Sequence, residues 1–245
     1  AHAGGALVGA GLVELAAAFR IAGRRVPRAG VVLGGLVVVA GAYFWGAEGM
    51  LLGLFAGSAL LTAWRLIEGL VPNWETPPRT LIRDVFSGLF TLVYVAFLAS
   101  FTVLLVEAEN GQWWVFALVV IVVSVDVGAY AAGVTLGKHK MAPRISPNKT
   151  WEGFAGAAIV AMAVGTVVAI FALDQPWWVG IILGVVVLFT ATGGDLTESL
   201  IKRNLGVKDM SSWIPGHGGF LDRLDSLLPS AVGVYGVALV LGAVS

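Results

Sequence analysis

Long apolar runs separated by short polar segments form the dominant pattern of this chain. Eight runs are long enough to cross a membrane as helices: residues 4–20, 29–47, 49–67, 84–106, 113–136, 154–173, 177–200 and 227–244. A spanning helix needs about 20 mostly apolar residues, because the hydrocarbon core of a bilayer is about 30 Å thick. The pattern therefore predicts an all-α, polytopic integral membrane protein with about eight transmembrane helices.

The basic residues are confined to alternate connections between these runs. All 15 lysines and arginines fall within residues 20–28, 65–83, 138–149 and 202–223, and the intervening connections carry only acids. Connections rich in Lys and Arg face the cytoplasm in most membrane proteins. We therefore expect the four basic connections on the cytoplasmic side, since a miscounted span would have placed bases on both sides.

Composition supports this assignment and narrows the chemistry. The chain is 58% hydrophobic and 12% charged, whereas soluble domains contain about 25% charged residues. The net charge is zero, so no overall basic balance indicates nucleic acid. The absence of cysteine excludes disulfides, thiolate metal sites and cysteine nucleophiles.

Several features of the N-terminal half predict packing rather than chemistry. Glu14 lies six residues before Arg20, and we interpret it as an interior carboxylate paired with an arginine. Three prolines should prevent residues 71–83 from forming one helix. Close helix contacts are expected at Gly30, Gly34, Gly35, Gly49, Gly53 and Gly57.

The densest polar stretch, residues 195–225, holds five acids and four bases. Asp195, Glu198, Ser199 and Lys202 follow the i, i+3, i+4, i+7 spacing of one helix face. Asp222 and Asp225 lie three residues apart at the predicted start of the last helix. Carboxylates on two converging helix ends suit Mg²⁺, which prefers carboxylates, water and substrate phosphates. The alternative is a set of ion pairs that closes a loop.

A second polar region precedes this stretch. Asp126 lies inside an apolar run and shares a helix face with Tyr130, four residues later. We interpret Asp126 as part of the wall of a hydrated cavity, with a purely packing role as the alternative. Residues 137–153 form a basic connection whose Ser146, Asn148 and Thr150 could bind phosphate oxygens. His139 is expected to belong to that basic surface.

Residues 199–225 match the pattern S-x-x-K-R-x4-K-D-x5-P-x-H-G-G-x2-D-R-x-D at every fixed position. This stretch resembles the signature of phosphatidate cytidylyltransferases, also called CDP-diacylglycerol synthases. The resemblance extends back through residues 146–153 and 126–130, whereas the first 110 residues share only hydrophobic character with that family. It implies N-terminal transmembrane helices over residues 1–110, used for packing or dimerisation, and a catalytic region over residues 111–245.

The resemblance implies that CTP and phosphatidic acid form CDP-diacylglycerol and pyrophosphate, by Mg²⁺-assisted attack of the lipid phosphate on the CTP α-phosphate. It implies a requirement for Mg²⁺, of which one or two ions could bind. We expect Asp195 and Asp222 to be the main metal ligands, with Asp225 either behind them or on a second ion, and Lys208 to act as a further catalytic residue. The substrate contacts would come from Asp126, Ser146, Asn148, Lys149, Thr150, Lys202, Arg203, Lys208, His217 and Arg223. We expect a homodimer in a bacterial inner membrane, with the site facing the cytoplasm. Family members often have nine spans, which fits a lost N-terminal helix.

Two other functions remain open from the sequence. A CTP-dependent polyprenol or dolichol kinase would transfer only the terminal phosphate, so the position of the label in the lipid product separates it from a nucleotidyltransferase. An ion-coupled transporter would use Asp126 and Asp195 as coupling sites and would need no CTP.

Overall fold

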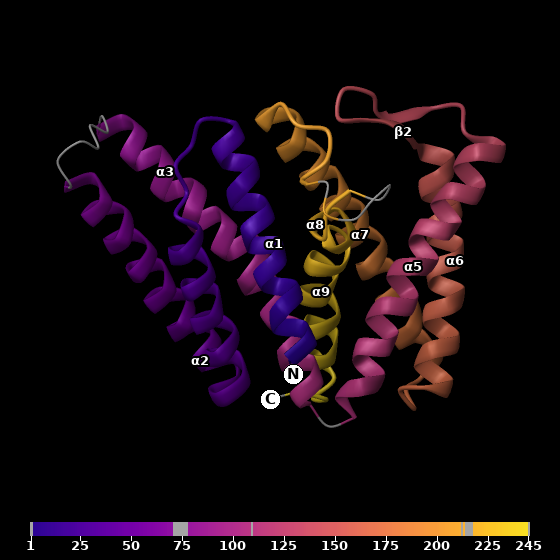
Figure 1. Ribbon diagram of the computed structural model, residues 1–245. Helices are drawn as coiled ribbons and strands as arrows, with labels where there is room; N and C mark the ends of the chain where they lie inside the picture. The colour runs from indigo at the N-terminus through magenta and orange to yellow at the C-terminus, as the bar shows by residue number, and fades with distance from the viewer. Residues whose placement is uncertain (1, 71–77, 109, 212, 214–217, 245) are drawn as a thin grey trace. The chain divides into compact units, whose positions relative to one another are not determined.

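The computed structural model describes residues 2–70, 78–108, 110–211, 213 and 218–244 (Figure 1). Its elements are α1 (His2–Ile21), α2 (Arg28–Leu70), α3 (Pro78–Thr91), the π-helical η1 (Leu92–Phe97), α4 (Leu98–Glu107), α5 (Gly111–Leu136), β1 (Lys140–Ala142), β2 (Ser146–Thr150), α6 (Trp151–Phe171), α7 (Trp177–Leu205), α8 (Leu221–Leu224) and α9 (Leu227–Val240). Within the described residues, 6 helical stretches are long and apolar enough to cross a membrane. The protein is therefore a polytopic, predominantly helical membrane protein, as predicted.

The chain folds into two compact units. The first unit contains residues Ala1–Leu104 and Asn204–Leu224, and the second contains residues Leu105–Arg203 and Asp225–Ser245. The segment Asn204–Leu224 therefore belongs with the N-terminal helices, although it follows α7 in the sequence. Most of the signature stretch lies in this segment.

Helix α2 is a hairpin of two arms rather than one straight rod (Figure 1). The turn lies at Trp45 and Gly46, and the φ of +61° at Gly46 is readily accessible to glycine. The arms touch through backbone: a Cβ added at Gly41 would lie 2.1 Å from the carbonyl oxygen of Gly49. Added at Gly57, it would lie 2.7 Å from the carbonyl oxygen of Gly34. The predicted glycine packing is confirmed within α2.

A continuous helical run from Pro78 to Glu107 contains α3, η1 and α4. It begins earlier than the predicted span at residue 84, because proline is well tolerated in the first turn of a helix. The predicted interruption therefore does not extend over residues 78–83, and residues 71–77 lie outside the described part of the chain. Inside this unit, the guanidinium of Arg65 contacts the Asp84 carboxylate at 2.8 Å, with both side chains buried.

The second unit packs its helices through close backbone approaches. A Cβ added at Gly165 of α6 would lie 2.4 Å from the Gly180 carbonyl oxygen of α7. One added at Gly194 of α7 would lie 2.2 Å from the carbonyl oxygen of Asp225. This last contact brings the polar end of α7 directly against the segment that precedes α9.

The connection between α5 and α6 contains regular structure that the sequence pattern did not predict. Its strands β1 and β2 pair antiparallel, with Lys140 opposite Thr150 and Ala142 opposite Ser146. This small hairpin lies at the ends of α5 and α6 (Figure 1). It adds a β element to a fold predicted to be all-α.

Candidate functional site

The β1–β2 hairpin is fixed to the helices by short polar contacts. Thr150 is the N-cap of α6, and its hydroxyl oxygen accepts the Gly153 N–H at 3.1 Å. The Glu152 carboxylate accepts the backbone N–H groups of Lys138 and His139, each at 3.1 Å. His139 also contacts Glu152 through Nδ1, at 2.6 Å. His139 therefore helps to anchor the hairpin, in addition to lying on the exposed basic surface.

A cavity of about 290 Å³ lies in the second unit, between the hairpin and the polar ends of its helices. Asp126 and Tyr130 of α5 and Asp195 of α7 line it together, as the helical spacing of the first two residues predicted. The hairpin contributes Ser146, Asn148, Lys149 and Thr150. Five predicted substrate-binding residues and one predicted metal ligand, far apart in the sequence, therefore line one cavity.

Opposite charges meet at the wall of this cavity. The ammonium of Lys149 lies 2.6 Å from the Asp195 carboxylate, and both side chains are half-buried. Ser199, one turn further along α7, donates its hydroxyl to Asp195 at 3.3 Å. Asp195 also interacts electrostatically with Asp126 and Asp225. The cavity therefore gathers acidic groups that one lysine only partly compensates.

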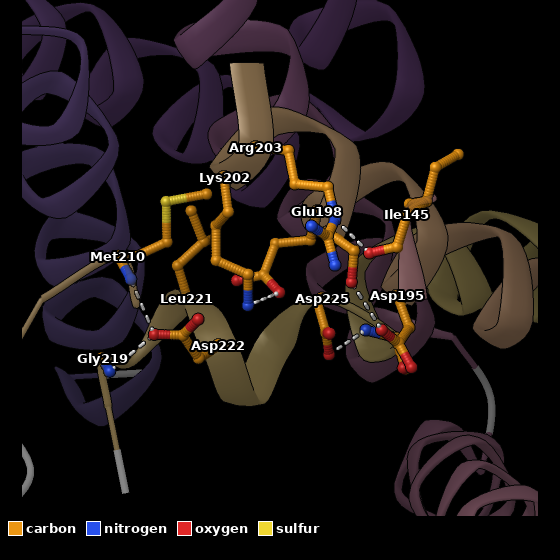
Figure 2. Close-up of polar contacts among 12 residues, drawn as sticks. Ile145, Asp195, Glu198, Lys202, Arg203, Met210, Gly219, Leu221, Asp222 and Asp225 are labelled. Atoms are coloured by element: carbon orange, nitrogen blue, oxygen red, sulfur yellow. Dashed lines mark hydrogen bonds and ion pairs between the residues drawn. The ribbon is translucent and has the colours of Figure 1, made fainter. Parts of the chain in front are cut away.

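The next turns of α7 extend the polar face that begins with Asp195 and Ser199 (Figure 2). Lys202 pairs with the buried carboxylate of Glu198 at 2.8 Å. The guanidinium of Arg203 donates to the carbonyl oxygen of Ile145, which ties α7 to the hairpin. The predicted i, i+3, i+4, i+7 face is confirmed, and both bases have partners within the protein.

Asp222 lies in the first unit, on the short helix α8. Its Oδ2 accepts the backbone N–H of Met210 at 3.0 Å and that of Gly219 at 2.8 Å (Figure 2). Asp225 belongs to the turn before α9 in the second unit, and its carboxylate accepts the Ser226 N–H at 2.7 Å. The two aspartates thus lie three residues apart at the start of the helical stretch Leu221–Val240, as predicted, although a turn at Asp225 and Ser226 divides this stretch into α8 and α9.

Three other predicted site residues fall near α8 in the sequence. Lys208 is exposed in the connection that follows α7, and Arg223 is exposed on α8. His217 lies outside the described residues.

Glu14 of α1 contacts the signature segment, which the sequence did not reveal. Its buried carboxylate accepts hydrogen bonds from Ser211, Phe220 and Leu221. Among the residues that the structure describes, it forms no ion pair with an arginine, so that prediction is wrong. No local pattern could have indicated these partners, which lie about 200 positions away.

The donor set of the second-unit cavity is compatible with Mg²⁺. Within the described ranges, no group of three His, Asp or Glu side chains is close enough to hold a metal ion by itself. Mg²⁺ is commonly bound by one or two carboxylates, with water and substrate phosphates completing the shell. Asp126 and Asp195 supply two carboxylates to one cavity, which meets that requirement.

Comparisons with known proteins identify relatives over most of the chain. The family model described as the cytidylyltransferase family matches residues 2–241. A phosphatidate cytidylyltransferase of Mycobacterium bovis is 40% identical over 227 residues, covering 91% of this chain and 74% of the relative. One from Brucella suis is 38% identical over 191 residues, covering 76% of this chain and 68% of the relative. The chain therefore belongs to the cytidylyltransferase family.

Proposed function

We propose that this membrane protein is a phosphatidate cytidylyltransferase, which forms CDP-diacylglycerol and pyrophosphate from CTP and phosphatidic acid. The observation that carries the proposal is the similarity to relatives of that name at 38–40% identity. The cavity lined by Asp126, Lys149 and Asp195 supports it, because carboxylates and a base meet beside a hairpin rich in hydrogen-bond donors.

The reaction requires positioning more than activation of a nucleophile. A phosphomonoester has a second pKa of about 6, so the phosphatidate phosphate is largely an oxyanion at neutral pH. Its oxygen attacks the α-phosphorus of CTP, and the bond to the β-phosphate oxygen breaks to release pyrophosphate. No serine or histidine base is needed. Holding two anions in line accounts for most of the required rate enhancement.

The hairpin residues suit the phosphate-binding part of this task. Ser146, Asn148 and Thr150 bring hydroxyl and amide groups to the cavity wall, and Lys149 brings a positive charge. Charge-assisted hydrogen bonds to phosphate are roughly twice as strong as neutral ones. Lys149 would exchange its Asp195 partner for a phosphate oxygen, or contact both. Lys202, Arg203, Lys208, His217 and Arg223 are proposed to bind the remaining phosphate charge.

We propose that Asp195 holds Mg²⁺ in the second-unit cavity, where Asp126 supplies a further carboxylate. Asp222 and Asp225, the other ligands expected from the sequence, stay proposed contacts of the ion. Bound Mg²⁺ would neutralise charge on the phosphates of CTP. The Oδ2 of Asp222 accepts two backbone N–H groups, so any contact of Asp222 with the ion would come in addition to these hydrogen bonds. Asp126 would shape the cavity and hold water beside the ion.

The membrane arrangement is part of the same proposal. Eight transmembrane helices result if α1 and the two arms of α2 each span the bilayer. Basic connections meet within each unit: Arg24 contacts Ser87, and Arg83 contacts the Gly23 carbonyl oxygen. In the second unit, Arg203 contacts Ile145. We place these connections on the cytoplasmic side of a bacterial inner membrane, and we expect a homodimer formed through the helices of residues 1–110.

An assay with two differently labelled forms of CTP tests the function. Purified protein in detergent with phosphatidic acid and Mg²⁺ should transfer label from the α-phosphate of CTP to the lipid fraction and release pyrophosphate. Label on the γ-phosphate should stay out of the lipid. Transfer of γ-label to a lipid would instead indicate a kinase. Removal of Mg²⁺ by EDTA should abolish transfer, and added Mg²⁺ should restore it.

A further inference from the structure

Glu14 is a buried charge that the proposed chemistry does not use. Its side chain is 1% exposed. Its Oε1 accepts the Ser211 hydroxyl at 2.5 Å and the Phe220 N–H at 3.0 Å, and its Oε2 accepts the Leu221 N–H at 2.8 Å. All these residues belong to the first unit. A buried carboxylate is costly unless hydrogen bonds compensate it, and three polar groups of the signature segment provide that compensation.

Glu14 contacts the signature at two places in the sequence, Ser211 and the pair Phe220 and Leu221, which directly precedes Asp222. Asp222 binds the residues next to these two places, Met210 and Gly219. The three consecutive N–H groups of Gly219, Phe220 and Leu221 are therefore divided between two carboxylates. Movement of Glu14 would break the hydrogen bonds to the Phe220 and Leu221 N–H groups and would shift the backbone of the adjacent Asp222.

The fit between Glu14 and this backbone depends on a glycine of the signature. A Cβ added at Gly219 would lie 2.7 Å from Oε2 of Glu14, closer than side chains tolerate. Gly219 therefore allows the carboxylate to approach the start of α8. Uncharged glutamine at position 14 would have one oxygen and an NH₂ group, and the NH₂ group cannot accept the N–H of Phe220 or Leu221.

We propose that Glu14 is a positioning residue for the nucleotidyl transfer reaction: it holds the start of α8 and so fixes the backbone of Asp222, a proposed Mg²⁺ ligand, and of Arg223, a proposed phosphate-binding residue. This inference rests on the proposed function. Glu14 acts through the backbone of residues 220 and 221 and does not touch substrate. The first helix thus contributes to the site, although the family signature does not include it.

Two variants of the contact and one packing control test the proposal in the purified full chain. Glu14→Gln removes the charge and one acceptor. The milder Ser211→Ala removes one of the three hydrogen bonds to Glu14, together with the hydrogen bond that the same hydroxyl accepts from the Trp213 N–H at 3.2 Å. Leu15→Ala is the control, because Leu15 is also fully buried on α1 but makes none of these hydrogen bonds. The measurements are kcat and KM for CTP, the thermal unfolding midpoint, and hydrogen exchange of peptides covering residues 218–224 without substrate.

Glu14→Gln should lower kcat about 10- to 100-fold, because small displacements of reacting groups have effects of that order. Hydrogen exchange in residues 218–224 should become faster. Ser211→Ala should change both in the same direction by less. Leu15→Ala should lower the unfolding midpoint by at least as much as Glu14→Gln, while kcat stays within about twofold of wild type.

The proposal is overturned if Glu14→Gln leaves kcat and exchange unchanged, or if Leu15→Ala lowers kcat as much at an equal loss of thermal stability. The latter result would make Glu14 a residue of fold stability alone. Failure of the wild-type protein to form CDP-diacylglycerol would instead refute the proposed function. In that case, unchanged exchange in Glu14→Gln would still show that Glu14 does not hold the start of α8.

Discussion

At the scale of single residues, the aspartates of the candidate site already contact other groups of the protein. Asp195 pairs with Lys149 across the cavity wall, and Asp222 accepts two backbone N–H groups. The i, i+3 and i+4 spacings predicted that residues on one helix would meet. They could not predict Lys149 beside Asp195, because that pairing depends on how the hairpin folds back over α7.

Replacing Asp222 with asparagine separates its hydrogen bonds to the backbone from its proposed contact with Mg²⁺. Asparagine keeps a carbonyl oxygen that can accept the N–H groups of Met210 and Gly219, but it loses the negative charge. We expect Asp222→Asn to lower kcat about 100-fold or more and to leave the unfolding midpoint nearly unchanged. Asp222→Ala should lower both, since it also removes the backbone contacts. Near-normal CTP-dependent activity in Asp222→Asn would contradict the metal assignment.

Lys149 offers a test of the phosphate-binding hairpin. Lys149→Ala removes a charge-assisted contact worth about 1.5–3 kcal/mol, so kcat/KM for CTP should fall roughly 10- to 100-fold. Lys140→Ala is the matched control, because Lys140 is an exposed base on the other strand and does not line the cavity. Equal effects of the two substitutions in a steady-state assay would indicate a general effect of basic charge rather than a site at Lys149.

At the scale of elements, helix positions followed from the apolar runs, whereas helix shape did not. Hydropathy placed two spans over residues 29–67, and the structure contains one hairpin with its turn at Trp45 and Gly46. Hydropathy cannot show how tightly two arms approach, because that depends on which glycines face each other. The β1–β2 pair was not predicted, because its short strands carry no alternation of apolar and polar residues.

The glycine contacts inside α2 predict a large difference between two similar substitutions. Gly41→Ala would place a Cβ 2.1 Å from the Gly49 carbonyl oxygen and force the arms apart, costing about 1–3 kcal/mol. Gly9→Ala on α1 meets nothing within 4 Å and should be neutral or stabilising by up to about 1 kcal/mol, since alanine favours helix. Unfolding midpoints in detergent should therefore fall for the first variant only. Equal midpoints would show that the arms can separate freely.

At the scale of the whole molecule, the charge pattern was the most informative feature of the sequence. It indicated which connections share a side, and within each unit basic connections do meet. It could not show that the signature segment would return to the N-terminal helices, because Glu14 and Leu221 are 207 positions apart. Hydrophobic patterns specify helices and leave such long-range polar contacts undetermined.

Orientation in the membrane can be tested directly because the chain has no cysteine. Single cysteines at two exposed positions, Arg144→Cys in the hairpin and Asp174→Cys between α6 and α7, provide the probes. A membrane-impermeant maleimide added outside intact cells should label Asp174→Cys alone, and both after permeabilisation. Labelling of Arg144→Cys from outside would reverse the proposed orientation. Activity of each variant serves as the control for correct folding.

The partners of Glu14 also determine when this protein can finish folding during its synthesis. A ribosome adds about 5–20 residues per second, so roughly 10–40 s separate the appearance of Glu14 from that of Leu221. During that interval Glu14 lacks the hydrogen bonds that compensate for the burial of its carboxylate, so burial of this group is unfavourable. A polypeptide released before residue 221 would retain this defect permanently. The hydrogen bonds of the first helix to the signature segment therefore form only after residue 221 has been synthesised.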